Sequence, residues 1–177
     1  MNMSPETSGK ARETLRALLA SDPSGILENI AIEHGISLQT VFECLPDETR
    51  SFAPGSEAES VLLDIAAWGP VTVLVHTPDV ILECKGPLPA GRFAHGYYNI
   101  GGGSPVSGHL RLDRCAAIAF VRRPFMGADS CSVNFFNAAG EAMFKVFVGR
   151  DDKRALLADQ IERFTALRER LSTEVVA

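Results

Sequence analysis

The fold of this chain is decided by three neighbouring runs: Ala116-Ala-Ile-Ala-Phe-Val-Arg122, Ser130-Cys-Ser-Val-Asn-Phe-Phe136 and Ala142-Met-Phe-Lys-Val-Phe-Val148. Their β-branched and aromatic residues are typical of β-strands. The turns between them, at Pro124–Gly127 and Asn137–Gly140, are short, whereas parallel pairing needs long crossover connections. We therefore expect the three runs to pair as an antiparallel sheet.

More strand patterns precede these runs. Val71–His76 and Val80–Gly86 flank a proline-containing turn, which predicts a β-hairpin. Arg92–Ile100 and Ser107–Leu112 are expected as two further strands, separated by a glycine-rich turn. The sheet should therefore occupy most of the chain between residues 71 and 148.

Helical patterns lie on both sides of the strand region. Apolar residues at helical spacing and residues that cap helices predict where they begin and end. Helices are expected from about Lys10 to Ser21, from about Ser24 to His34, from the N-cap Ser37 to Pro46, from Ser56 to about Trp68, and from Asp151 onward. Ser56 and Glu59 have the spacing of a capping box. Residues 1–10 are expected to be a disordered lead-in, and residues 47–55 a loop.

These patterns predict an α+β fold, with an N-terminal helical cap, a large antiparallel β-sheet and a C-terminal helix packed on one sheet face. The expected organisation is a lead-in and first helix over residues 1–23, followed by a single α+β domain over residues 24–177.

Composition excludes some classes of function. The chain has 177 residues with 46% apolar residues and a net charge of −5, which is typical of a globular protein and unfavourable for binding nucleic acid or anionic membranes. No apolar run is long enough to span a bilayer, and the N-terminus lacks a signal-peptide core. We therefore expect a cytoplasmic protein.

The four cysteines form no CxxC pair, so a structural zinc site is not expected.

A helix-turn-helix is the alternative that the N-terminal helices raise, because Ala31, Gly35 and Val41 have its spacing. The residues that would enter a DNA groove include no Arg or Lys, and phosphate contacts need cations. A structural cap is the better interpretation.

The stretch from His95 to His109 is the candidate functional region. It contains two histidines and both tyrosines of the chain, joined by a run of glycines. Imidazole and phenolate can bind haem iron or another metal without cysteines. The alternative is a hairpin with a glycine-rich turn and ordinary strand aromatics.

Strand alternation restricts which side chains can act together. It places His76 on the face of Thr72 and Leu74, and it directs His95 and Tyr97 to one side and Tyr98 to the other. It also places His109 on a polar face, beside Ser107 and Arg111. Arg92 and Arg111 are cations that can pair with ligand carboxylates, or can simply form the solvated face of the sheet.

Several runs together resemble the bacterial cytosolic haem-utilisation carrier proteins of the HutX/ChuX type. They are Trp68-Gly-Pro-Val-Thr-Val-Leu-Val-His-Thr-Pro-Asp79, His95-Gly-Tyr-Tyr-Asn99, Ser107-Gly-His109, Arg123-Pro-Phe-Met-Gly127, Phe135-Phe-Asn137 and Phe144-Lys-Val-Phe-Val-Gly-Arg-Asp-Asp152. The resemblance extends from about Ser24 through the last helix.

The resemblance implies a homodimer that binds haem and delivers it to a haem-degrading protein, without being an enzyme itself. It implies haem contacts at His76 and His109 and an iron ligand at Tyr97, or at the adjacent Tyr98. His95, Arg92 and Arg111 complete the candidate haem-binding set. Two alternatives remain at this point, a haem-degrading enzyme that acts with an electron donor and a helix-turn-helix regulator.

Overall fold

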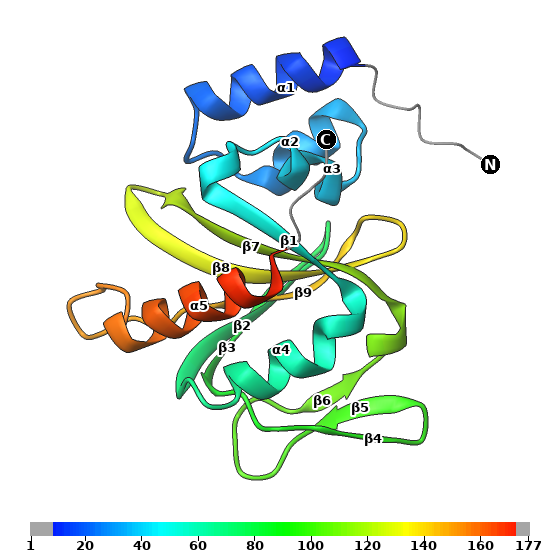
Figure 1. Cartoon of the computed structure of the whole chain (residues 1–177), viewed down its shortest axis with the longest axis vertical. Coiled ribbons are helices and arrows are strands. Elements are labelled where there is room, and N and C mark those ends of the chain that lie inside the picture. Colours follow the sequence, from blue (N-terminus) through cyan, green and yellow to red (C-terminus); the bar gives the residue numbers. More distant parts are fainter. Residues whose placement is uncertain (1–8, 173–177) are drawn as a thin grey trace.

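The computed structural model describes residues 9–172, and its core is a six-stranded antiparallel sheet (Figure 1). The strand order is β1 (Arg50–Pro54), β7 (Cys115–Phe125), β8 (Ala128–Asn137), β9 (Ala142–Phe147), β2 (Pro70–His76) and β3 (Ile81–Pro87). A smaller antiparallel sheet contains β4 (Arg92–Ala94), β5 (Tyr97–Ile100) and β6 (Gly108–Leu110). The predicted α+β class and the antiparallel pairing of the three defining runs are confirmed.

Helices cover both faces of the large sheet (Figure 1). The first face carries α4 (Ala58–Ile65) and α5 (Ala158–Leu171), and we call it the α5 face. The opposite face carries α1 (Gly9–Ser21), α2 (Leu27–His34) and α3 (Leu38–Glu43) over part of its area, and we call it the α2 face. Three 3₁₀ turns complete the elements: η1 (Asp47–Thr49), η2 (Gly55–Glu57) and η3 (Leu112–Arg114).

Strand alternation separates the chemistry of the two faces. On the α5 face, β7, β8 and β9 bury Phe120, Phe135 and Phe144, and Phe120 packs edge-on against Phe164 of α5. The α2 face receives the alternate residues of the same strands, several of which are polar. The small sheet packs on the α5-face core through Tyr98 and Ile100. The main apolar core therefore lies on the α5 face, and polar groups gather on the other.

Two predicted end signals of the N-terminal helices are confirmed, although α2 begins at Leu27 rather than Ser24 and α3 ends at Glu43 before Pro46. The hydroxyl of Ser37 accepts a hydrogen bond from the Thr40 backbone N–H at 3.2 Å, as an N-cap does, and Gly35 ends α2 with φ of 62°. Leu15 and Leu19 of α1 are buried with Phe42 and Phe136, whereas Leu18 points to solvent. These helices form a cap on the sheet. No helix within residues 9–172 is long and apolar enough to cross a membrane.

Several predicted boundaries are wrong. Residues 50–54 form strand β1 rather than a loop, because they pair with β7. The expected strand 92–100 is broken in two at His95 and Gly96, which have φ of 53° and 78°. The Ser56–Glu59 capping box does not form, since α4 begins at Ala58 without a side-chain cap.

The last helix begins at Ala158, later than its acidic residues predict. The Asp151 carboxylate instead accepts hydrogen bonds from the backbone N–H groups of Lys153 and Ala155, both at 2.9 Å, and so closes a turn before the helix. Phe164 and Leu167 of this helix are buried against the sheet, as the prediction of a packed C-terminal helix requires. Most of the expected lead-in, residues 1–8, lies outside the described residues, and Gly9 and Lys10 belong to α1.

Candidate functional site

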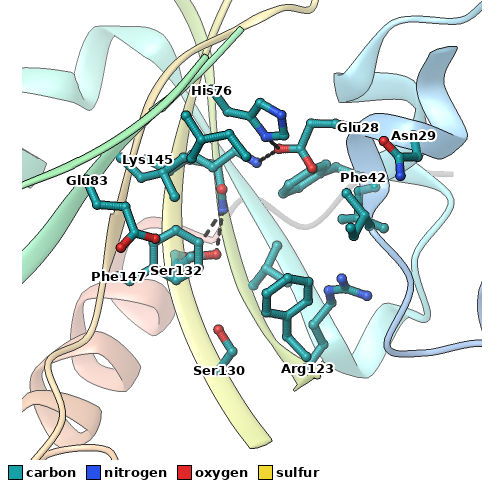
Figure 2. Close-up of a pocket in the computed structure, with 17 residues that line it drawn as sticks. Glu28, Asn29, Phe42, His76, Glu83, Arg123, Ser130, Ser132, Lys145 and Phe147 are labelled. Atoms are coloured by element: carbon teal, nitrogen blue, oxygen red, sulfur yellow. Dashed lines mark hydrogen bonds and ion pairs between the residues drawn. The ribbon is translucent and has the colours of Figure 1, made fainter. Parts of the chain in front are cut away.

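A cavity of about 290 Å³ lies between α2 and the α2 face of the large sheet (Figure 2). Its walls come from segments that are far apart in the sequence. They include Ile26, Leu27, Glu28 and Asn29 at the start of α2, Phe42 of α3, Leu74 and His76 of β2, Ile81 and Glu83 of β3, Val121, Arg123 and Phe125 of β7, Ser130, Ser132 and Asn134 of β8, and Lys145 and Phe147 of β9.

Strand register explains why polar groups converge here. Leu74 pairs with Lys145, and Lys145 pairs in turn with Asn134 of β8, so the side chains of these residues share one face. His76 follows two residues after Leu74 and therefore points to the same face. This confirms the predicted orientation of His76 along its strand.

Glu28 is the centre of an ionic cluster at the cavity wall (Figure 2). Its Oε1 accepts a hydrogen bond from Lys145 Nζ and lies 3.2 Å from Nδ1 of His76. Burial alone would raise the pKa of Glu28, but the charge and hydrogen bond of Lys145, with smaller contributions from a backbone hydrogen bond and from His76, hold that pKa below its usual value. The carboxylate therefore stays ionised, and it connects α2 to β2 and β9.

Arg123 is a buried cation in the same cavity, with only 9% of the residue exposed. Its guanidinium donates hydrogen bonds to the carbonyl oxygens of Pro23, at 2.6 Å, and Gly25. Burial lowers the pKa of Arg123. Among residues 9–172, no carboxylate forms an ion pair with Arg123. A buried positive charge with only neutral acceptors favours an anionic group in the adjacent space.

Asn134 adds an unpaired acceptor to the cavity wall. Its amide nitrogen donates to the carbonyl of Ala119 at 3.2 Å and to the hydroxyl of Ser132 at 3.0 Å. Its Oδ1 is fully buried and has no hydrogen-bond partner among the described residues. Buried acceptors are normally satisfied, so an unpaired oxygen beside the cavity is unusual.

A second cluster lies on the outer face of the small sheet. Nδ1 of His109 lies 2.6 Å from Oδ1 of Asn99, and the His109 ring meets the Tyr97 ring edge-on with 6.0 Å between centroids. The guanidinium of Arg111 lies 5.6 Å from the centre of the Tyr97 ring and forms a forked ion pair with Asp113. We call Tyr97, Asn99, His109 and Arg111 the small-sheet cluster. It presents a phenol, an imidazole and a cation to solvent.

The other predicted site residues lie elsewhere. Tyr98 is buried in the core, where its hydroxyl accepts a hydrogen bond from the Gly91 N–H at 3.0 Å and burial raises its pKa. His95 is exposed in the turn between β4 and β5, and Arg92 is exposed at the start of β4. Core side chains enclose Tyr98, which does not line the cavity.

The structure does not bring the two clusters together within the chain. Neither Tyr97 nor His109 lines the cavity that contains His76. The small sheet packs on the α5-face core, whereas the cavity lies on the α2 face. One chain therefore presents two separate groups of candidate haem contacts.

Sequence analysis missed Glu28, Arg123 and Asn134 as site residues. A signal for Asn134 was present, because Ser130, Ser132 and Asn134 alternate with apolar residues on a strand buried on both faces. Such a strand is normally a continuous apolar run. The sequence around Glu28 does not mark it as a site residue, because the helix dipole alone makes acidic residues common in the first turn of a helix.

Comparisons with known proteins agree with one another. A family model described as haem utilisation ChuX/HutX matches residues 51–167. The intracellular heme transport protein HutX of Vibrio cholerae serotype O1 is 34% identical over 165 residues, which cover 93% of this chain and 86% of the relative.

Solved structures are similar over nearly the same span. A protein from Erwinia carotovora is 48% identical with a TM-score of 0.87, and the match covers 89% of this chain and 98% of that one. A structure of the heme-binding protein ChuX is 43% identical with a TM-score of 0.81, and the match covers 89% of this chain and 98% of that one.

Proposed function

Because the chain belongs to the ChuX/HutX haem-utilisation family, we propose that it binds haem inside the cell and carries it to a haem-degrading partner, without degrading haem itself. The Vibrio relative is an intracellular heme transport protein, and the ChuX relative is a heme-binding protein. The proposal extends these properties to this chain and places the haem by the chemistry of its own residues.

The chemistry of the residues around the cavity on the α2 face supports its assignment to haem. Haem has an iron that accepts an imidazole ligand, a flat apolar porphyrin and two carboxylate arms. The cavity offers the His76 imidazole, the apolar side chains of Phe42, Leu74 and Phe147, and the unpaired cation of Arg123. The observation that carries the proposal is that this buried guanidinium, without a carboxylate of its own, shares a cavity with a histidine.

The small-sheet cluster is proposed as a second haem-contact surface. Tyr97 can supply a phenolate to ferric iron, and His109 an imidazole. The guanidinium of Arg111, 5.6 Å from the centre of the Tyr97 ring, is a cation that can meet a haem carboxylate at the same surface. Because this cluster is exposed, a haem held there can be passed on without opening the protein. His95 and Arg92, exposed on the same small sheet, stay as candidate contacts.

A homodimer is proposed as the working form. Strand β3 lies at the edge of the large sheet, with a hydrogen-bonded neighbour on one side only among the described strands. The hairpin that it forms with β2 exposes apolar side chains, among them Leu82 with 62% of its surface exposed. An exposed apolar edge strand is a ready surface for pairing with a second copy.

A haem titration of the purified chain, followed in the visible spectrum, tests the proposal. We expect a saturable shift of the Soret band, and each of His76→Ala, Tyr97→Phe and His109→Ala should alter its position if the residue ligates iron. His34→Ala is the matched control, because His34 is exposed at the end of α2 and does not line the cavity.

The outcomes separate the functions. No shift beyond that of free haem would contradict a haem carrier. A shift that none of the three substitutions changes would contradict the ligand set alone. Added reductant should leave the bound haem intact, and formation of a biliverdin-like product would instead support the haem-degrading enzyme.

A further inference from the structure

The two ring nitrogens of His76 have different surroundings. Nδ1 lies 3.2 Å from Oε1 of Glu28, an ion-pair distance. Nε2 has no hydrogen-bond partner among the residues that the structure describes. A neutral imidazole carries one proton, and the nitrogen that keeps the proton cannot bind a metal. The carboxylate beside Nδ1 favours the proton on that nitrogen.

Glu28 is itself held in place. The same Oε1 accepts a hydrogen bond from Lys145, whose side chain is only 7% exposed. Glu28 comes from the first turn of α2, whereas His76 and Lys145 come from neighbouring strands of the sheet. A carboxylate fixed between a helix and a sheet can hold an imidazole ring in one orientation.

We propose that Glu28 is a positioning residue for haem binding, which accepts the Nδ1 proton of His76 and leaves the Nε2 lone pair for iron. This inference rests on the proposed function of the cavity. Histidines that bind metals usually donate their other ring N–H to a carboxylate or carbonyl, and such partners make the imidazole a stronger ligand. Glu28 has the position, the charge and the rigid support for this role.

Lys145 limits how strongly Glu28 attracts the Nδ1 proton of His76. A carboxylate whose only partner is the imidazole attracts the Nδ1 proton strongly. A carboxylate that also binds an ammonium group attracts that proton less, because the ammonium neutralises part of its charge. Because both donors meet the same oxygen of Glu28, His76 should be a ligand of intermediate strength. That suits a carrier, which has to release its haem to a partner.

The first test uses the protein without haem. Nitrogen-15 NMR of the histidine rings, recorded about two units above the ordinary imidazole pKa of about 6.5, reports the tautomer of each neutral ring. We expect the proton of His76 on Nδ1 in the wild type and on Nε2 in Glu28→Ala. Asn29→Ala, in the next residue along the same helix and the same cavity wall, is the matched control and should leave His76 unchanged.

The second test uses the haem complex. We expect Glu28→Ala to weaken haem binding by about 10–100-fold, the usual range for losing the partner of a metal-ligating histidine. The iron–histidine stretching band of the ferrous complex should also move to lower frequency. Glu28→Gln keeps an acceptor oxygen but no charge, so it should shift the iron–histidine band by an intermediate amount. The thermal midpoint of Glu28→Gln shows whether its fold is intact.

The results distinguish this inference from the proposed function. If the wild type shows no iron–histidine band, or His76→Ala retains it, His76 is not the ligand and the placement of haem in the cavity is wrong. If His76 is the ligand but neither its tautomer nor the band responds to Glu28→Ala, the positioning role of Glu28 is wrong. Loss of folding in Glu28→Ala leaves Glu28→Gln to decide between these results.

Discussion

Arg122 and Arg123 are neighbours in β7 that point to opposite faces of the large sheet. Arg122 faces solvent and forms an ion pair with Asp129 at 2.7 Å, whereas Arg123 lines the cavity and has only neutral acceptors. The two residues have the same chemistry in sequence and different electrostatic surroundings in the fold. This contrast makes a matched pair of variants.

We expect Arg123→Gln to weaken haem binding by about 10-fold or more, because a hydrogen bond to a charged group contributes roughly 1.5–3 kcal/mol. Arg122→Gln should leave the affinity unchanged. Titration with haem and with its dimethyl ester separates charge from shape, since the ester lacks the carboxylates. The ester should bind wild type and Arg123→Gln equally.

Arg123→Lys provides the check on folding, because it keeps the charge that the proposal requires. It should recover part of the lost affinity. If Arg122→Gln and Arg123→Gln weaken haem binding equally, the carboxylate-binding role assigned to Arg123 is wrong.

At the scale of elements, α2 is attached to the sheet by contacts of two strand cations. Lys145 of β9 reaches Glu28 in the first turn of α2, and Arg123 of β7 reaches the backbone just before the helix. The helix has only 8 residues, so it depends on tertiary contacts for its stability. These contacts, together with the apolar packing of Leu27 and Ile30, hold the helix over the sheet.

Acid should therefore destabilise the protein through Glu28. Its pKa in the folded chain lies below the ordinary value of 4.5, so its contribution to stability is fully present above 4.5 and is lost as the pH falls through the folded pKa. We expect the urea midpoint of the haem-free protein to fall over this range, and to fall less steeply in Glu28→Gln. If the urea midpoint falls equally with pH in the wild type and in Glu28→Gln, ionised Glu28 contributes nothing to stability.

The ion pair can also be tested at neutral pH. Lys145→Met leaves the Glu28 carboxylate largely buried and without its cation, which should cost roughly 3 kcal/mol in the free energy of unfolding. The double variant Lys145→Met/Glu28→Gln should recover part of that loss, because no unpaired charge remains. Denaturant titrations of the wild type, the two single variants and the double variant measure the coupling between Lys145 and Glu28. If the two single losses of stability add up to that of the double variant, the residues are not coupled.

At the scale of the whole molecule, the proposed dimer depends on the β2–β3 hairpin. Val75 and Leu82 are paired across the two strands, and both are exposed. We expect the wild type to have the mass of two chains by light scattering, and Val75→Glu/Leu82→Glu to have the mass of one. The variant should be monomeric because dimerisation through the hairpin would bury its two introduced carboxylates without partners.

Ile32→Glu is the control for the dimer, because Ile32 is an exposed apolar residue of α2 and not part of the hairpin. It should not change the mass. A wild type with the mass of one chain would contradict the dimer, whereas an unchanged mass in the hairpin variant alone would move the interface elsewhere.

What the sequence determined by itself is local. Alternation in β2 placed His76 on the correct face, the short turns predicted antiparallel pairing, and Ser37 and Gly35 marked the ends of two helices. Each of these depends on residues within a few positions of one another, so a linear pattern can carry it. The strand at residues 50–54 was missed because Arg50–Pro54 becomes a strand only by pairing with β7.

Only the tertiary structure decided which side chains share a site. Lys145 and Glu28 are 117 positions apart, and Arg123 and Pro23 are 100 positions apart. Their contacts follow from the docking of a short helix on a sheet face, for which no local pattern exists. The same packing separated Tyr97 and His109 from His76, although all three belong to one candidate set. The sequence thus determined the chemistry that each strand offers, and the path of the chain through space decided which of those groups meet.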